Sequence, residues 1–535
     1  MPSETLGGFL ADAAARFGTN DALYSGEVRW SYLELAREAA RIADGLRGLG
    51  VRPGEPVGVL LPNWPEFFAS VLGIAAVGAT AVCLNTMATE SELAFYLDHA
   101  RVRWLVYTPR FLKHDYEARL AGFGVDRPSA ERTAARDMVG RIAFVPDGRA
   151  VPAGALDYRR LGAVPADPIA ALRSGDAASP GDPAVVFFTS GSTAQPKAVV
   201  HAHRALVHQA FAASDAFGLD AEDRAFGALP MFFAGGFVII ALITFATGGA
   251  VVLQDHFEAG EALDLMERRC VTFYAGWQLA PALVDHPSFA RRRLRLRKGI
   301  FTESPALPML LCSDHVAVAA YGLSETATVV CLARWDDPAD LRQRGFGRPL
   351  PGVELRIVDP ETGATRTDGE VGEILVRGPS SMLGYLGVGR EESFTPDGFF
   401  RTGDYGRLDE TGTLRFDGRL KEVIKTAGVN VAAAEVESCL AKVDGVAAAY
   451  VVPVPHPVRG ENVAAFVVAR PGAKPDGAAI IEHCRREMAS YKVPRHLFLL
   501  SADGVPRTGT QKVDKPLLRR RAVEMAGGSD DLLAV

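Results

Sequence analysis

The chain has 535 residues, of which 48 % are apolar and 23 % are charged, and a formal net charge of −6. This length exceeds what one hydrophobic core supports, and the proportions are ordinary for a globular protein, so we expect at least two domains. The charge argues against nucleic acid as the main partner, and six scattered cysteines favour a reducing cytoplasm over a disulfide scaffold or a zinc site.

The N-terminal stretch MPSETLGGFLADAAARFG carries acidic residues and lacks the basic segment that opens a signal peptide. The one long apolar run, residues 235–253, is interrupted by Thr244, Thr247 and Gly248-Gly249. A buried helix followed by a strand is therefore expected there rather than a membrane span. These features predict a soluble, cytoplasmic protein.

Helical and strand patterns alternate from residue 1 to about residue 180. Helices are expected at residues 32–49, 67–77 and 92–100, and strands at 56–61, 81–84 and 104–107. This alternation predicts a parallel sheet covered by helices. The stretch 126–183 is rich in Pro, Gly, Ala, Asp and Arg, which predicts a loop-rich excursion with weak strands.

The stretch 189–197, TSGSTAQPK, combines four hydroxyl side chains with a glycine and ends in Pro196 and Lys197. It follows the apolar run 184–188, a predicted buried strand, so the loop leaves the edge of a sheet. Gly191 lets the backbone turn, hydroxyl and amide groups can donate to phosphate oxygens, and Lys197 adds positive charge. We predict a phosphate-binding loop whose ligands are Thr189, Ser190, Gly191, Ser192, Thr193 and Lys197.

This loop has two competing interpretations. A Walker loop places glycine directly before the lysine, Ser or Thr directly after it, and then a helix, but this chain has Pro196, Ala198 and Val199-Val200 there. A solvated Ser/Thr loop without a ligand is the more common structure for such a stretch taken alone.

The second half of the chain repeats the alternation and then changes character. Short strands with Pro/Gly turns between residues 345 and 384 predict a smaller β region, and a compact α+β unit begins at residue 421. We place the boundary at Gly418, which gives an N-terminal domain of residues 1–418 and a C-terminal domain of residues 419–535. The expected helices are 203–217, 432–440 and 477–488, and the expected strands are 353–358, 372–377, 413–416, 447–454 and 463–469; residues 224–229 lead into the segment that begins at Pro230.

Four further motifs follow the loop in a fixed order. They are YGLSET at 321–326, FRTGD at 400–404, GRLKE at 418–422 with Lys425 and Gly428, and PRTGTQK at 506–512. With the loop, they resemble the adenylate-forming superfamily of acyl-CoA synthetases, adenylation domains of peptide synthetases, and firefly luciferase. The resemblance covers most of the chain, and five motifs in register are specific where one would be weak.

The resemblance implies an α/β fold, with a large N-terminal domain of stacked βα layers plus a β region, and a small mobile α+β C-terminal domain. It implies an AMP-forming acyl-CoA ligase, which joins a carboxylic acid to coenzyme A through acyl-AMP and uses ATP and Mg²⁺. Activating a carboxylate with ATP brings two anions together, so positive charge must neutralise them while the attack on the α-phosphorus is held in line.

By similarity, each motif residue on the ATP side has a role. Glu325 would bind Mg²⁺, which suits a hard oxygen donor, and Tyr321 would stack on adenine. Taken singly, however, a residue such as Tyr321 is more often a core aromatic, one such as Glu325 a solvated surface residue, and a dyad such as Gly403-Asp404 a simple turn. The remaining residues assigned to the nucleotide are Gly322, Ser324 for the α-phosphate, Asp404 for the ribose hydroxyls and Arg419 beside it.

Similarity also assigns residues to the two half-reactions. Lys512 would bridge the carboxylate and the α-phosphate during adenylation. Lys421, which alone could be a surface lysine, would be the hinge about which the small domain rotates afterwards. That rotation would withdraw Lys512 and bring the loop of Lys425 and Gly428 to the site, where Gly428 lets pantetheine pass.

The residues that follow Pro230 predict an apolar pocket for the acid. Amino-acid-activating relatives place an Asp there, whereas this chain has no carboxylate to bind an amine. We therefore expect a non-amino, bulky apolar acid, although any one of these residues could instead pack the core. The candidate pocket residues are Phe232, Phe233, Gly235, Phe237, Gly276 and Trp277.

Three departures from the family pattern lie on the ATP side. Ala194 and Ala198 replace glycines, Phe233 stands where many acyl-CoA synthetases have histidine, and residues 298–305 replace the Gly-Gly-Ala-Pro wall of the adenine site.

The chain could therefore be a thiolation-only ligase that receives acyl-AMP from a partner adenylating enzyme. It could also be an adenylation enzyme that loads a carrier protein, or a non-catalytic nucleotide sensor, although Asp404, Arg419 and Lys512 argue against a sensor.

Overall fold

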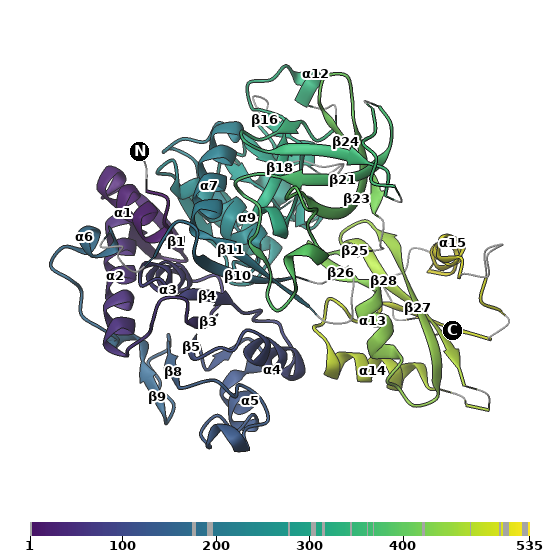
Figure 1. Ribbon diagram of the computed structural model, residues 1–535, viewed down its shortest axis with the longest axis horizontal. Coiled ribbons are helices and arrows are strands. Elements are labelled where there is room, and N and C mark those ends of the chain that lie inside the picture. Colours follow the sequence, from purple (N-terminus) through teal and green to yellow (C-terminus); the bar gives the residue numbers. More distant parts are fainter. Residues whose placement is uncertain are drawn as a thin grey trace.

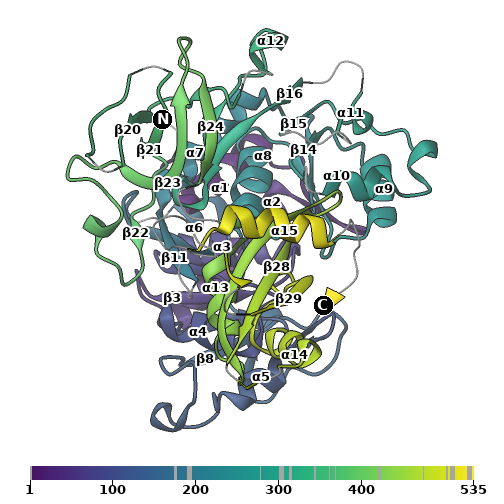
Figure 2. The same ribbon diagram turned by 90° about the vertical axis from the view of Figure 1, so that its right-hand side faces the viewer.

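The computed structural model describes residues 3–173, 178–189, 196–276, 279–300, 307–312, 316–342, 345–360, 362–367, 369–419, 423–470, 472–473, 475–501, 504–506, 513–526 and 533–534. Figure 1 shows a large N-terminal body and a smaller C-terminal one at the right. Both views place the last helix, α15 (Lys515–Ala526), on the side of the small body that faces away from the large one (Figures 1 and 2).

The first sheet of the large domain contains the strand that precedes the predicted phosphate loop. Its order is β22 (Gly384–Tyr385), β11 (Lys197–Ala202), β10 (Pro183–Thr189), β4 (Thr80–Cys83), β3 (Pro56–Leu60), β5 (Trp104–Tyr107), β8 (Gly140–Ala143) and β9 (Ala155–Asp157). The pairs from β10 to β9 are parallel, whereas β11 is antiparallel to both β10 and β22. β10 therefore lies inside the sheet, and the loop after its C-terminal end returns as β11.

The second sheet is parallel except for its last strand. Its order is β16 (Val316–Val318), β15 (Lys298–Ile300), β14 (Phe273–Tyr274), β12 (Arg224–Gly227), β13 (Ala250–Leu253), β1 (Asp21–Ser25) and β2 (Val28–Ser31). Only β1 and β2 pair antiparallel. Together the two sheets confirm the α/β class and the stacked βα layers.

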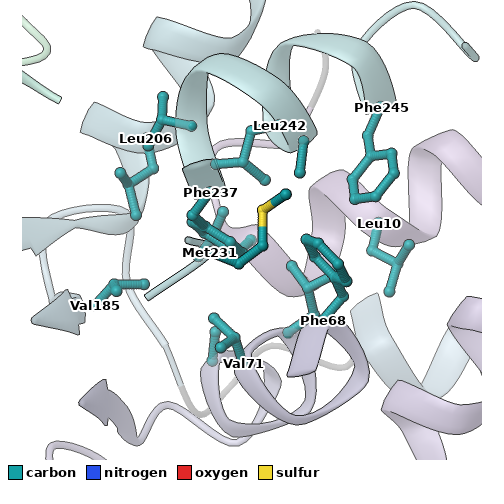
Figure 3. Packing of buried hydrophobic residues seen from close by; sticks show 14 of the residues in the cluster. Leu10, Phe68, Val71, Val185, Leu206, Met231, Phe237, Leu242 and Phe245 are labelled. Atoms are coloured by element: carbon teal, nitrogen blue, oxygen red, sulfur yellow. The ribbon is translucent and has the colours of Figure 1, made fainter. Parts of the chain in front are cut away.

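Helices fill the space between the two sheets. The main core takes residues from both sheets and from α1 (Leu6–Phe17), α2 (Tyr32–Gly48), α3 (Pro65–Ala76), α7 (His203–Phe217), η3 (Gly235–Leu242) and α8 (Ile243–Phe245). At its centre the rings of Phe68 and Phe237 stack with centroids 6.3 Å apart, next to Met231 and Phe245 (Figure 3). The stretch 235–242 is helical as expected, but it is wound as a π-helix, a rare form that often occurs near functional sites.

More helices cover the outer faces of the sheets. A second core lies under α4 (Glu90–His99) and α5 (Tyr116–Gly122), and a third lies under α9 (Ala259–Arg268), α10 (Ala280–Val284) and α11 (Leu307–Leu310). Thr89 and Glu92 form a capping box that fixes the start of α4. The short elements on the surface are β6 (Arg110–Phe111), β7 (His114–Asp115), η1 (Ser129–Glu131), η2 (Tyr158–Arg160), α6 (Pro168–Arg173), η5 (Phe289–Arg291), α12 (Ala339–Arg342) and η7 (Arg390–Glu392).

Two antiparallel sheets form a β region that extends beyond the predicted residues 345–384 on both sides. One contains β17 (Ala320–Leu323), β18 (Thr328–Leu332) and β19 (Arg348–Pro349), and η6 (Ser324–Thr326) lies between its first two strands. The other has the order β20 (Glu354–Val358), β21 (Gly372–Arg377), β23 (Phe400–Leu408) and β24 (Leu414–Arg419).

The small domain is a sheet with helices on both faces. Its strand order is β26 (Val429–Ala432), β25 (Val423–Thr426), β28 (Gly460–Ala469), β29 (His496–Leu500) and β30 (Leu533–Ala534), and β27 (Val446–His456) also pairs with β28. One core contains residues of α13 (Ala433–Leu440) and α14 (Gly477–Glu487), and the other contains residues of α15. The last strand of the β region, β24, ends at Arg419, and the first strand of the small domain, β25, begins at Val423.

A buried ion cluster joins the two domains. The Lys492 Nζ atom lies 2.6 Å from Oε1 of Glu92 in α4 and 2.7 Å from Oε1 of Glu435 in α13. The three side chains are between 2 % and 9 % exposed. Asn85 donates to the Tyr491 hydroxyl beside the cluster at 3.2 Å. This is the polar centre of the interface between α4 and the small domain.

Candidate functional site

The strands around the predicted phosphate loop position its two ends. Thr189 and Lys197 are paired across β10 and β11, so the loop leaves and re-enters the sheet at one point. The Lys197 Nζ atom lies 4.3 Å from the centroid of the Tyr385 ring, a cation–π geometry. Ala198 belongs to β11, and its side chain is buried in the core beneath α4. The replacement of the family's glycine by Ala198 therefore lies in a strand and not in the loop.

Tyr385 also contacts the predicted metal ligand. Its hydroxyl donates to Glu325 Oε1 at 2.6 Å, and the Met382 amide donates to the Glu325 carbonyl at 2.8 Å. Burial, with the neighbouring carboxylate, raises the pKa of Tyr385, so the phenol remains a donor. Our sequence reasoning missed Tyr385, because its role depends on the pairing of β22 with β11 and no local pattern encodes that pairing.

A second residue missed from sequence, His201, supports the same motif. His201 is fully buried in β11, and its Nε2 atom lies 2.7 Å from the Ser324 carbonyl. Burial lowers its pKa to about 4, so the ring is neutral and Nε2–H donates to that carbonyl. A polar residue inside the apolar run 198–202 was the available signal.

The segment that carries Ser324 and Glu325 has an unusual backbone. A Cβ atom on Gly322 would lie 1.8 Å from the Thr328 carbonyl oxygen, so only glycine fits. Ala327 and Thr328 have φ angles of +49° and +87°, and the left-handed region is strained for a β-branched residue such as threonine. Such strain is typical of segments whose geometry serves a function.

Tyr321 and Asp404 lie together beside this segment. The Tyr321 hydroxyl donates to Asp404 Oδ2 at 2.8 Å, and both residues are buried. The Tyr321 ring packs near Phe416, with centroids 6.0 Å apart. Asp404 pairs with Arg419 across β23 and β24. The structure thus brings together three residues that the sequence assigned to the nucleotide.

The loop of Lys425 and Gly428 lies near Phe416, the ring that packs beside Tyr321. It is the turn of the β25–β26 hairpin, where Ala427 and Gly428 have φ angles of +48° and +81°. Two consecutive left-handed residues are typical of a tight hairpin, so Gly428 has a conformational reason to be glycine. The Lys425 Nζ atom lies 5.8 Å from the Phe416 ring centroid.

The candidate pocket residues divide into two groups. Phe237 is fully buried between the sheets and stacks on Phe68, so it packs the core. Phe232 and Phe233 lie just before η3 with ring centroids 4.7 Å apart; Phe232 is buried in the main core, whereas Phe233 is only partly buried. A Cβ atom on Gly235 would meet open space, whereas one on Gly276 would lie 2.9 Å from the Tyr274 hydroxyl oxygen.

Several predicted site residues lie outside the described residues. They are Ser190, Gly191, Ser192, Thr193, Ala194, Trp277, Lys421 and Lys512, together with residues 301–305 of the stretch that replaces the adenine wall and the side chain of Arg419.

Glu325 and Lys197 are the described residues that the sequence assigns to the metal and to the phosphates. No Lys or Arg in the described residues forms an ion pair with Glu325, and no group of three metal-ligating side chains occurs among them. Mg²⁺ in phosphate sites is commonly held by one or two carboxylates plus the phosphates themselves. Glu325 with Lys197 nearby fits that pattern.

Among the described helices, none is long and apolar enough to cross a membrane.

Comparison with known proteins identifies relatives over nearly the whole chain. The AMP-binding enzyme family matches residues 10–386, and the AMP-binding enzyme C-terminal domain matches residues 435–512. The chain is 32 % identical to a 3-[(3aS,4S,7aS)-7a-methyl-1,5-dioxo-octahydro-1H-inden-4-yl]propanoyl:CoA ligase of Rhodococcus jostii, over 95 % of this chain and 97 % of that protein. It is 31 % identical to a feruloyl-CoA synthase of Amycolatopsis sp., over 97 % of this chain and all of that protein. Its fold matches the amide bond synthetase McbA of Marinactinospora thermotolerans with a TM-score of 0.80 and 28 % identity, covering 97 % of this chain and 99 % of that one.

Proposed function

The chain belongs to the AMP-binding enzyme family and is an AMP-forming acyl-CoA synthetase, and from this premise we propose that it joins a bulky, non-amino carboxylic acid to coenzyme A through acyl-AMP. Its cofactors are ATP, coenzyme A and Mg²⁺. The observation that carries the proposal is the convergence of Lys197, Glu325 and Asp404 around one short segment. Lys197 and Glu325 both contact Tyr385, and Asp404 accepts from Tyr321 four residues before Glu325, which supports their proposed roles as phosphate-binding cation, metal ligand and ribose acceptor.

In the proposed first half-reaction, a carboxylate oxygen of the acid attacks the α-phosphorus of ATP, the α–β phosphoanhydride bond breaks, and pyrophosphate leaves, which gives acyl-AMP. Mg²⁺ held by Glu325 and the phosphates would supply charge neutralisation. Lys197 and the hydroxyls of residues 189–193 would bind the phosphates, and Asp404 would hold the ribose with Arg419 beside it. Lys512 would stabilise the charge that develops between the carboxylate and the α-phosphate.

In the proposed second half-reaction, the small domain presents its β25–β26 hairpin. The approach of Lys425 to Phe416, whose ring neighbours Tyr321, supports this assignment because it turns the hairpin toward the predicted adenylate. Gly428 at the turn would leave room for pantetheine. Lys421, between β24 and β25, would be the hinge between the two arrangements.

The proposed substrate class rests on the residues at the start of η3. Phe232 and the partly buried Phe233 are apolar, and Gly235 borders open space. Two relatives act on a fused-ring propanoate and on ferulate, as their names state. We therefore expect a cyclic or aromatic acid, with Phe232, Phe233, Gly235, Gly276 and Trp277 near it.

Mass spectrometry of a panel of cyclic and aliphatic acids with ATP, Mg²⁺ and coenzyme A tests the proposal. We expect acid-dependent pyrophosphate release and a coenzyme A thioester, with cyclic acids preferred. Thioester formed only from synthetic acyl-AMP would favour a thiolation-only ligase and a partner adenylating enzyme. An arm with an amine in place of coenzyme A tests amide formation, the reaction named for one structural relative. Acyl-AMP without any thioester would overturn the ligase assignment.

A further inference from the structure

One side chain lies between the predicted metal ligand and the predicted phosphate-binding lysine. The Tyr385 hydroxyl donates to Glu325 Oε1 at 2.6 Å, and the same ring lies under the Lys197 Nζ atom at 4.3 Å from its centroid. We propose that Tyr385 is a positioning residue for adenylation, which holds Glu325 and Lys197 in the arrangement that the metal-bound triphosphate requires. This inference rests on the proposed function.

The backbone fixes Tyr385 relative to Lys197. Tyr385 pairs with Val199, two residues after Lys197 on the same strand. Hydrogen bonds from Leu383 to the Val200 carbonyl at 2.8 Å and from Leu386 to the Ala198 carbonyl at 2.9 Å enclose that pair. Because residues two apart on a strand face the same side, the tyrosine ring meets the lysine without any loop between them.

The same segment fixes Glu325. The Met382 amide holds the Glu325 carbonyl at 2.8 Å, and the Tyr385 hydroxyl holds one carboxylate oxygen. Within the described part of the chain, this hydroxyl is the one side-chain donor to the Glu325 carboxylate, so it orients Oε1 and leaves Oε2 to a metal. Residues 382–385 therefore fix both the main chain and the side chain of the metal ligand.

The tyrosine also keeps two opposite charges apart. In the described part of the chain, no ion pair joins Lys197 to Glu325 or to any other carboxylate. A direct pair would satisfy both groups and compete with the ligands they are predicted to bind. The ring face holds the ammonium and the hydroxyl holds the carboxylate, so the cation remains available to phosphate and the anion to Mg²⁺.

Two substitutions separate the two contacts. Tyr385→Phe removes the hydroxyl and keeps the ring, whereas Tyr385→Leu removes both. Calorimetric titration of ATP with and without Mg²⁺ reports binding directly, and pyrophosphate release at varied Mg²⁺ reports adenylation. Tyr107→Phe is the matched control, because the Tyr107 hydroxyl donates to the Glu117 carboxylate at 2.5 Å outside the site.

For Tyr385→Phe we expect about a tenfold rise in the Mg²⁺ concentration for half-maximal pyrophosphate release, the scale of a lost hydrogen bond to a charged group. ATP binding without Mg²⁺ should stay the same. Tyr385→Leu should also weaken metal-free ATP binding about threefold, because the ring no longer holds Lys197. Thioester formation from synthetic acyl-AMP should change less than about twofold in both variants, since it needs no triphosphate.

An unchanged Mg²⁺ requirement in Tyr385→Phe would overturn the inference. So would an equal loss of both half-reactions, since that would indicate a general structural role. If the wild-type protein releases no pyrophosphate with any acid, the proposed function fails instead. The calorimetric effect of Mg²⁺ on ATP binding then still decides the role of Tyr385.

Discussion

Replacing Lys492 by methionine should release the small domain from the arrangement seen here. The ammonium of Lys492 is shared by Glu92 and Glu435, so Lys492→Met leaves two buried carboxylates side by side without a cation. Breaking a buried pair in this way costs about 3–5 kcal/mol. The polar contacts beside it are Asn85 to Tyr491 at 3.2 Å, and Thr89 and Ser91 to the Glu487 carbonyl at 3.4 and 3.3 Å. Three such hydrogen bonds supply about 1.5–4.5 kcal/mol together, so the loss matches or exceeds them.

Small-angle scattering and hydrogen exchange of α4 measure this release directly. We expect a larger radius of gyration and faster exchange in α4 for Lys492→Met. Thioester formation from acyl-AMP should fall more than pyrophosphate release, because the β25–β26 hairpin loses its support. Burial raises the pKa of Glu435, so its carboxyl gains a proton more readily and the defect should shrink as the pH falls.

Two further variants sharpen the test. Glu92→Gln should be much milder, because the cluster has one carboxylate in excess and Lys492 with Glu435 remains a neutral pair. Lys515→Met is the matched control, since the Lys515 ammonium pairs with Glu437 at 2.8 Å within the small domain. Unchanged scattering and exchange in Lys492→Met, or a Glu92→Gln defect as large as that of Lys492→Met, would refute the reasoning.

Three more substitutions test the remaining assignments. Lys512→Ala should lower acyl-AMP formation by about 10²-fold or more, the scale of a lost charge-stabilising group, and spare thioester formation from acyl-AMP; equal losses would contradict the role. Lys421→Pro should restrict the hinge and uncouple the half-reactions, and unchanged overall turnover would remove that assignment. Burial raises the pKa of Glu66 from 4.5 to about 7, so its stabilising contribution is present below pH 4.5 and is lost as the pH rises through 7. In thermal or chemical unfolding, Glu66→Gln should therefore gain stability over the wild type between about pH 5 and pH 8, by at most about 3 kcal/mol.

Local sequence patterns predicted the elements but not their partners. The strand 104–107 coincides with β5 because it is a short apolar run between turn residues. The helix 203–217 coincides with α7 because its apolar residues recur at helical spacing. The weak strands expected within 126–183 are present as β8 and β9, but the sequence did not indicate that they extend the first sheet. The π-helical winding of η3 was also missed, because 235–242 is apolar on all sides and lacks a distinguishing period.

The candidate site shows the same limit. Glu325, Asp404 and Tyr321 could be predicted because each lies in a motif of adjacent residues. Tyr385 could not, and His201 is marked only as a polar residue in an apolar run, because their partners are 60 and 123 residues away in the chain. The cluster of Lys492 joins residues up to 400 positions apart. Pairings over such distances depend on how the sheets and domains assemble, which local propensity does not encode.

The β10–β11 ladder has a consequence for how this protein could be changed. From Thr189↔Lys197 to Pro183↔Ala202, antiparallel pairing joins the two strands, and β10 also pairs with β4. Both strands are largely buried, so the register is strongly specified along the ladder, and a replacement loop of the same length should leave it unchanged. That short stretch can be exchanged as a unit, in the laboratory or in evolution, without rebuilding the domain. Loops taken from relatives could be inserted between Thr189 and Lys197, so that phosphate binding by different loops is compared on one unchanged domain.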